Sequence, residues 1–321
     1  MKFLKKLTLF LILLVSIFSM TACSASSNLA LNGYLWFKNP SSFAPNWTET
    51  SVYDITFTNV TPSKSDAIGT EGYSLNITEG TLITTLKSYT NTEKGNYYVY
   101  TTEFNLVGEY VIPNPSESGY DKVEESYQTV TEFKDDLTPI RSEKHYVSKL
   151  SDYKYDYVLT YEGNTATAKL TESSTTDENK NTQTFTFEKY NKKAYIDNDI
   201  LLLAQRLFNV NSSFGRQFRT IDVLSNKLHD MQSYAYLIDK ELDVKKLANY
   251  TLNGVNLALT EETISCAHVE IAINDKFAGA PLECYYAQDR ETHRHRLIET
   301  YLPFGSVGYL KVHLASVEVS E

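Results

Sequence analysis

Polar and apolar residues alternate along much of this chain, and the alternation is clearest in residues 153–162. Every second residue from Tyr153 to Tyr161 is aromatic or aliphatic, and most of the residues between them are charged or polar. Because successive side chains of a strand point to opposite faces, this pattern predicts a strand with one buried face. Gly163 and Asn164 are predicted to form a two-residue turn, and residues 165–172 to return as the partner strand.

Similar alternation predicts strands throughout the rest of the chain. The segments are 53–59, 97–104, 127–133, 140–147, 184–190, 234–238, 264–273, 282–287, 297–302 and 307–319. Exposed loops are predicted at 112–116, which holds two prolines, and at 172–181, with a turn at 274–279. So many strands at short spacing indicate an antiparallel sheet that curls or folds on itself.

One stretch departs from the strand pattern and predicts a helix over residues 198–208. Asp197 can cap its first turn, and Ile200, Leu203, Ala204 and Leu207 fall at helical spacing to form an apolar stripe. We expect this helix to be buried against the sheet. A second, short helix is a candidate at 243–249.

Three short segments stand out: residues 138–141 (Thr-Pro-Ile-Arg), 195–198 (Tyr-Ile-Asp-Asn) and 285–289 (Tyr-Tyr-Ala-Gln-Asp). They resemble segments of uncharacterised bacterial envelope proteins of a domain-of-unknown-function type. Such proteins resemble the periplasmic lipoprotein-carrier half-barrels, so the resemblance, over residues 138–314, implies a curved sheet around inner helices. We therefore expect a mainly β fold, one large curved antiparallel sheet, half-barrel or sandwich-like, that wraps at least one buried helix. An architecture of this kind implies no particular activity.

The N-terminus has the organisation of an export signal. Lysines at positions 2, 5 and 6 precede an apolar run over 7–18, which is shorter than the ~18 to 20 apolar residues of a spanning helix. Met20, Thr21 and Ala22 then precede Cys23, an arrangement that resembles the lipobox of bacterial lipoproteins. The resemblance implies cleavage before Cys23 and acylation of its thiol, whereas the alternative is an ordinary secretory signal with a cysteine at the boundary by chance.

The expected organisation is therefore a signal peptide over 1–22, a lipidated tether over 23–33 and a single large β-rich domain over 34–321. Two or more acyl chains hold a protein on a membrane stably. We expect the mature protein at the extracytoplasmic face of the cell membrane, or on the outer membrane if the host has one. The membrane is then a partner through the N-terminal lipid.

Charge limits the other partners. The chain has 30 Lys and Arg against 40 Asp and Glu, a formal charge of −10, and loss of the three lysines of the signal makes it −13. Nucleic acid binding needs a basic surface that releases counterions, so nucleic acid is excluded as an expected partner. Close electrostatic docking on anionic lipid is disfavoured for the same reason.

Besides Cys23 the chain has two cysteines, too few for a disulfide-dense framework. Cys266 and Cys284 fall on neighbouring predicted strands. A single disulfide between them and two buried free thiols are both open alternatives, since free cysteine is a common apolar filler.

Candidate chemistry is sparse and gathers near residue 293. His293 and His295, with His268 or His313, are the best metal candidates, but two imidazoles are too few for a closed zinc site, so no metal is expected. Arg290, Arg294 and Arg296 form the one basic patch, a weak candidate for binding an anionic head group or an acidic partner. The alternative is a solvated strand face that balances neighbouring acidic residues.

No catalytic motif is found, and no cofactor is expected. The chain lacks a Gly-x-Gly pair, a phosphate loop ending in Lys-Ser or Lys-Thr, a Gly-x-Ser-x-Gly elbow and a His-Glu-x-x-His helix. The sequence therefore favours a noncatalytic envelope protein that binds an apolar or amphiphilic molecule in the concavity of its sheet. The alternatives are a scaffold with a filled interior that recruits an envelope protein partner, and an envelope hydrolase of unrecognised type.

Overall fold

Strands dominate the structure, a computed structural model that describes residues 47–61, 74–93, 95–111, 120–134, 136–176, 179–188, 195–206, 214–243, 249–252, 255–257, 263–273, 282–288, 295–304 and 308–320. The strands are β1 (Thr48–Thr58), β2 (Ser74–Asn91), β3 (Gly95–Val111), β4 (Tyr120–Phe133), β5 (Pro139–Ser148), β6 (Tyr153–Glu162), β7 (Thr165–Ser173), β8 (Asn181–Phe187), β9 (Phe214–Asp222), β10 (Lys227–Asp243), β11 (Asn249–Leu252), β12 (Val255–Leu257), β13 (Thr263–Ile273), β14 (Leu282–Ala287), β15 (Leu297–Phe304) and β16 (Gly308–Ser320). A short 3-10 turn, η2 (Asn198–Ile200), leads into the helix α2 (Leu201–Gln205).

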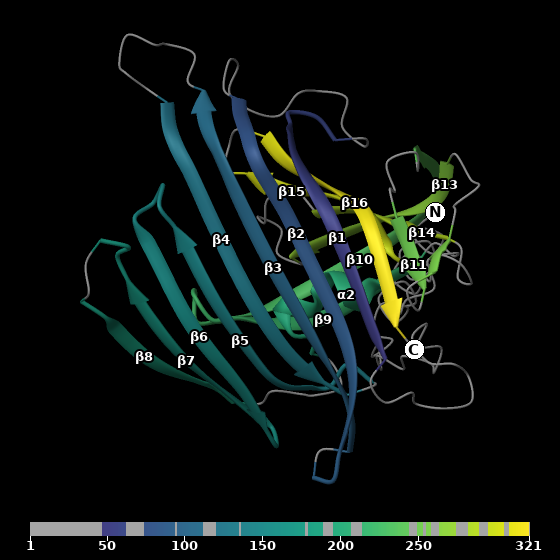
Figure 1. Cartoon of the computed structure of the whole chain (residues 1–321). Helices are drawn as coiled ribbons and strands as arrows, with labels where there is room; N and C mark the ends of the chain where they lie inside the picture. Colours follow the sequence, from purple (N-terminus) through teal and green to yellow (C-terminus); the bar gives the residue numbers. More distant parts are fainter. Residues whose placement is uncertain are drawn as a thin grey trace, which may run out of the picture.

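All the strands belong to one sheet, in the order β8-β7-β6-β5-β4-β3-β2-β1-β16-β15-β14-β13-β10-β9. Neighbours along this order are antiparallel, and β11 adds to β16 in parallel and to β12 (Figure 1). The first eight strands form an uninterrupted meander. The chain then returns so that its last strand pairs with its first, which joins the two halves of the sheet into one wall.

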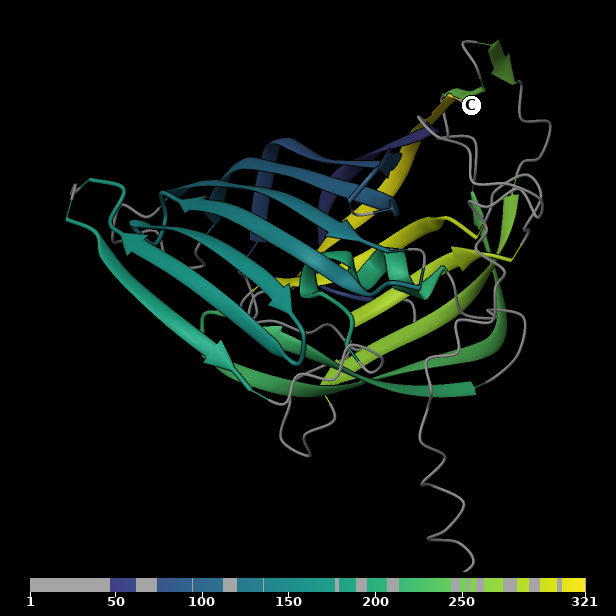
Figure 2. The ribbon, with the colours of Figure 1, turned by 90° about the horizontal axis from the view of Figure 1, so that it is seen from below.

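The wall curls around the helix, as predicted. In Figure 2 the helix lies between the strands β1 to β5 on one side and the strands β9, β10 and β13 on the other. Ile200, Leu203 and Ala204 of η2 and α2 are buried in the main hydrophobic core with inward-facing residues of both sides. The predicted mainly β fold, a curved antiparallel sheet around one buried helix, is confirmed.

The two edges of the sheet meet through side chains. Among the described residues, β8 pairs only with β7, while β9 pairs with β10 and receives a single bridge from Tyr195. A second hydrophobic cluster spans this seam, with β6, β7 and β8 on one side and Tyr195, Ile221 and Val223 on the other. The sheet is therefore not closed by strand pairing at this seam, and the apolar cluster packs between its two edges.

The helix begins as the sequence predicts. The side chain of Asp197 accepts a hydrogen bond from the backbone N–H of Asp199, and the first turn is 3-10 before it continues as α-helix. Tyr195 and Ile196 attach the approach to the helix to β9, where the N–H of Ile196 donates to the carbonyl of Arg219 at 3.0 Å. The predicted helix is confirmed up to Gln205, and residues 207–208 lie outside the described residues.

Several boundaries differ from the prediction or lie beyond the described residues. Strands β2, β9, β11 and β12 have no predicted counterpart, β7 extends to Ser173 and β8 already begins at Asn181. Asp243 and Asn249, the ends of the candidate second helix, are strand residues, and 244–248 lie outside the described residues. So do the predicted signal and tether (1–22 and 23–33), the loop at 112–116 and the turn at 274–279.

Candidate functional site

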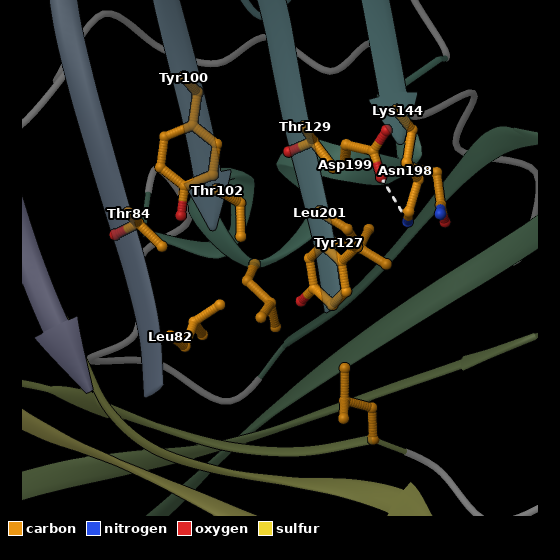
Figure 3. A pocket seen from close by; sticks show the side chains of 12 residues that line it. Leu82, Thr84, Tyr100, Thr102, Tyr127, Thr129, Lys144, Asn198, Asp199 and Leu201 are labelled. Carbon is orange, nitrogen blue, oxygen red and sulfur yellow. Dashed lines mark hydrogen bonds and ion pairs between the residues drawn. The ribbon is translucent and has the colours of Figure 1, made fainter. Parts of the chain in front are cut away.

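A cavity of about 230 Å³ lies between the inner face of the sheet and the helix. Figure 3 shows Lys144, Asp199 and Asn198 gathered at one end of it and Leu82 toward the other. Asn198 is exposed and marks the side that faces solvent. The described residues that line the cavity are Leu82, Thr84, Tyr100, Thr102, Tyr127, Thr129, Lys144, Asn198, Asp199, Leu201, Leu202 and Leu282.

A row of polar side chains crosses the sheet, and all of its members except Ser51 line the cavity. Ser51 on β1 is opposite Thr84 on β2, which is opposite Thr102 on β3, which is opposite Thr129 on β4. We call Ser51, Thr84, Thr102 and Thr129 the hydroxyl row; all four are buried. The same row continues through Lys144 on β5. Because side chains at paired positions share a face, the antiparallel register alone sets this polar row inside an apolar interior.

An ion pair closes the polar end of the cavity. The Nζ of Lys144 lies 3.1 Å from Oδ1 of Asp199, and the hydroxyl of Tyr157 donates to Oδ2 of Asp199 at 2.5 Å. The ammonium group also lies 5.0 Å from the centre of the Tyr127 ring, within range of a cation–π contact. Burial opposes the charge of Lys144, but the carboxylate of Asp199 outweighs it and raises the pKa of the amine. Lys144 is therefore charged at neutral pH.

Asp197 fixes the helix from behind the cavity. It is buried, caps the first helical turn and accepts a hydrogen bond from the hydroxyl of Tyr161. Burial and the nearby charge of Asp199 raise the pKa of Asp197 to about 6. These hydrogen bonds position the start of the helix and, through it, Asp199.

A narrow extension of about 20 Å³ continues inward between Tyr53, Tyr100, Leu203 and Arg206. Two guanidinium groups share one carboxylate beside it: Nη1 of Arg206 lies 2.7 Å from Oε1 of Glu49, and Nη2 of Arg296 lies 2.8 Å from Oε2. Burial alone would raise the pKa of Glu49, but the two arginines outweigh it and lower the pKa to about 2. The extension has room for about one water molecule.

The comparisons with known proteins support the architecture. No protein-family model matches the chain, and no curated protein matches it. Among solved structures, it is similar to a β-barrel-like protein of the domain of unknown function DUF1849 from Brucella abortus, with a TM-score of 0.51 and 12% identity. That similarity covers 87% of this chain and all of the other. At this identity the similarity shows the fold alone.

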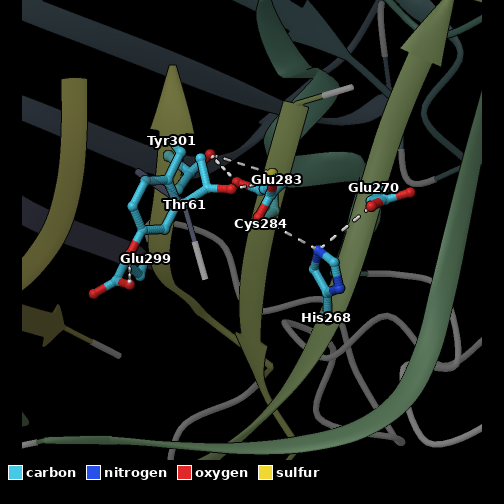
Figure 4. A network of polar contacts seen from close by, with 8 residues as sticks. Thr61, His268, Glu270, Glu283, Cys284, Glu299 and Tyr301 are labelled. Carbon is cyan, nitrogen blue, oxygen red and sulfur yellow. Dashed lines mark hydrogen bonds and ion pairs between the residues drawn. The ribbon is translucent and has the colours of Figure 1, made fainter. Parts of the chain in front are cut away.

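A second polar cluster lies on the opposite face of strands β13 to β16 (Figure 4). The hydroxyl of Thr61 donates to Oε1 of Glu283 at 2.6 Å, and Nε2 of His268 lies 3.9 Å from Oε2 of Glu283. On the adjoining strands Glu299 receives contacts from three partners, Tyr301, Lys311 and His313. Burial opposes ionisation of Glu299, but these contacts outweigh it and lower its pKa to about 2. This cluster faces away from the cavity and stabilises the packing of the outer face.

The candidate histidines that the structure describes do not share one strand face. His295 lies in the turn before β15, buried, with a backbone φ of 50° and its Nδ1 3.0 Å from the carbonyl oxygen of Ala287, so it is not on a strand face. His268 and His313 belong to the outer cluster, and His293 lies outside the described residues. In the described part of the chain, no group of three or more His, Cys, Asp or Glu side chains is placed to hold a metal ion.

The prediction that Arg296 belongs to a basic surface patch is wrong. This residue is 1% exposed and bound to Glu49, so neither a solvated strand face nor an open anion site describes it. The local sequence places it among charged residues, but the fold turns it inward toward a carboxylate 247 positions away. Arg290 and Arg294 lie outside the described residues.

The two late cysteines are free thiols. Strands β13 and β14 are neighbours, as expected, but the register puts Cys284 opposite Val269, and Cys266 opposite Ala287. Both thiols are fully buried, and burial raises the pKa of Cys284 to about 12. Of the two alternatives, the structure therefore favours two buried free thiols over a disulfide.

Cys23, the expected lipidation site, lies outside the described residues. Among the helices that are described, none has the length and apolar character needed to cross a bilayer.

Sequence analysis did not single out the residues that shape the cavity. Lys144 and Asp199 are 55 positions apart, and the threonines of the hydroxyl row lie on three separate strands. The sequence did contain one signal. Thr102, Thr129 and Lys144 are polar residues at strand positions that the alternation assigns to the buried face.

Proposed function

We propose that this protein is a noncatalytic, lipid-anchored envelope protein that holds an apolar or amphiphilic molecule between its sheet and its helix. The cavity carries the proposal, because its lining combines four leucines with an ion pair and several hydroxyl groups. Small-molecule sites are typically concave and mainly apolar, with a few placed polar groups that orient the ligand.

The cavity also favours binding over the alternatives. A scaffold that acts only through its surface needs a filled interior, whereas a cavity of about 230 Å³ leaves apolar walls without packing partners. A hydrolase needs a carboxylate or histidine prepared for proton transfer. Asp199, the carboxylate in the described lining, instead has both of its oxygens engaged, one by Lys144 and one by Tyr157.

Ligand capture is tested by native mass spectrometry of the full-length protein extracted from its host, together with a blocked cavity. Thr102→Phe places a ring in the cavity, whereas Thr101→Phe adds the same ring to the other face of β3 and is the matched control. We expect a copurifying molecule with the wild type and with Thr101→Phe, and its loss with Thr102→Phe. A protein that is always empty, or equal occupancy in both variants, would contradict the proposal.

The anchor is tested separately. The N-terminal sequence supports acylation of Cys23, and two or more acyl chains give long-lived attachment to a membrane. Cys23→Ser should release the protein from the membrane fraction. Equal membrane retention of the variant would show that the lipid is not what holds the protein there.

A further inference from the structure

The charges at the cavity are compensated by neighbours within the protein. Lys144 is paired with Asp199, and Arg206, at the narrow extension, is bound to Glu49. An incoming carboxylate that approached Lys144 would meet the charge of Asp199, and an incoming ammonium that approached Asp199 would meet Lys144. A head group of either sign is therefore repelled by one half of the ion pair as it is attracted by the other.

An uncharged hydroxyl group is suited to such a pair. A carboxylate has about four lone-pair sites, and the two oxygens of Asp199 use one each for Lys144 and Tyr157. An ammonium group has three N–H donors, and the one hydrogen bond of Lys144 goes to Asp199. A ligand hydroxyl can donate to Asp199 and accept from Lys144 at the same time, with no net charge to bury.

The hydroxyl row provides a further hydrogen-bonding group for a ligand hydroxyl, on the strand next to Lys144. Thr129 lines the cavity, is buried, and its Oγ1 makes no hydrogen bond with any residue that the structure describes. Buried hydroxyl groups without a partner are uncommon and need an explanation. Rotation about the Cα–Cβ bond of Thr129 would present this hydroxyl to a bound molecule, two positions along the inner face from the similarly unbonded Thr131, which does not line the cavity.

We propose that the cavity selects an amphiphile whose head group is uncharged and carries neighbouring hydroxyls, as in an acylglycerol or an alkyl glycoside. The hydroxyls lie between the Lys144–Asp199 pair and Thr129, and the apolar part lies against the leucines. At about 230 Å³ the cavity is more than ten times as large as the 20 Å³ extension, enough for a head group and a short chain segment. This inference rests on the proposed function of the cavity as an amphiphile site.

Four probes that share an eight-carbon chain test the inference by titration calorimetry, below their micelle concentrations at neutral pH. Monooctanoylglycerol and octyl β-glucoside carry hydroxyls, octanoate is an anion and octylammonium is a cation. We expect at least one hydroxyl probe to bind at least ~10-fold more tightly than either ion, the size of one buried charge conflict. The better of the two hydroxyl probes identifies glycerol or sugar as the head group.

Reciprocal charge variants sharpen the test. Asp199→Asn leaves Lys144 without its carboxylate and should raise the affinity for octanoate, whereas Lys144→Met should raise the affinity for octylammonium. Thr129→Val keeps the shape of the side chain and should weaken binding of the preferred hydroxyl probe by ~3- to 10-fold, the effect of one neutral hydrogen bond. Thr131→Val is the matched control and should leave binding unchanged.

The outcomes separate the two proposals. If all four probes bind with similar affinity, or an ion binds most tightly, the site takes amphiphiles but the preference for hydroxyls is wrong. If none of the four binds, the proposed function fails as well. Circular dichroism establishes that each charge variant is folded, and the wild-type series with Thr129→Val decides the matter if one of them is not.

Discussion

Replacing Glu49 by Gln should destabilise the protein more than any surface substitution, because the carboxylate is shared by two buried arginines. Both guanidinium groups lie within 2.8 Å of it, and all three side chains are nearly inaccessible to solvent. The pKa of Glu49 falls from 4.5 to about 2. At 1.36 kcal/mol for each pKa unit, this shift corresponds to about 3 kcal/mol of stabilisation. Breaking a buried ion pair on one side typically costs about 3–5 kcal/mol, so the two estimates agree.

The pH dependence has a definite sign. The folded-state pKa of Glu49 is below its unfolded value, so the ionised form stabilises the fold above pH 4.5. That contribution is lost as the pH falls from 4.5 through about 2. The difference in unfolding free energy between wild type and Glu49→Gln should therefore be largest near neutrality and shrink in acid.

Urea unfolding followed by circular dichroism measures this difference. Glu103→Gln makes the same chemical change at an exposed position on β3 and should alter the free energy of unfolding by no more than ~0.5 kcal/mol. A loss below about 1 kcal/mol for Glu49→Gln at neutral pH, or a difference that does not shrink in acid, would refute the electrostatic account of this cluster.

Three further outcomes follow from the same structure. The pKa of Asp197 is raised from its ordinary 3.8 to about 6, so the stability that its protonated form contributes is lost as the pH rises from 3.8 through about 6. The stability of Asp197→Asn relative to wild type should therefore increase by about 3 kcal/mol over that pH range in urea titrations, and a constant difference would contradict the raised pKa. Tyr157→Phe removes a hydrogen bond to Asp199 and should lower the free energy of unfolding by about 1.5–3 kcal/mol in the same assay. An unchanged urea midpoint would contradict this prediction. Cys266 and Cys284 should resist iodoacetamide in the native protein and react fully in urea without reductant, as mass spectrometry would show; unreactive thiols in urea would indicate a disulfide.

Alternation along the chain is a local property. It predicted the strands in which one face is apolar and the other is polar. Strand β6 fits because its inward residues are aromatic or aliphatic and all lie at one parity. Strand β2 was missed because it bulges between Ile77 and Glu79 and buries Thr84 and Ser88 beside its leucines, which removes a clean period of two. Burial of hydroxyl groups conceals a strand from any analysis of hydrophobic pattern.

The candidate site depends on which residues are paired across strands, and that information is not local. The hydroxyl row exists because the register aligns Thr84, Thr102 and Thr129, and a shift of one residue would turn one of these side chains to the outer face. Arg296 is a second case in which a partner distant in the sequence determines where a side chain lies. Its sequence neighbours indicated a solvated patch, but its partner, Glu49, comes from the opposite end of the described chain.

The seam between β8 and β9 has a consequence for the strength of the sheet. Elsewhere the circumference of the wall is fixed by backbone ladders, whereas here it is held by the packing of Tyr195, Ile221 and Val223 against β6 to β8. Among the described strands, parting this line would break apolar contacts but no ladder of hydrogen bonds. We therefore expect this seam to separate at a lower energetic cost than any ladder-bonded pair of described strands.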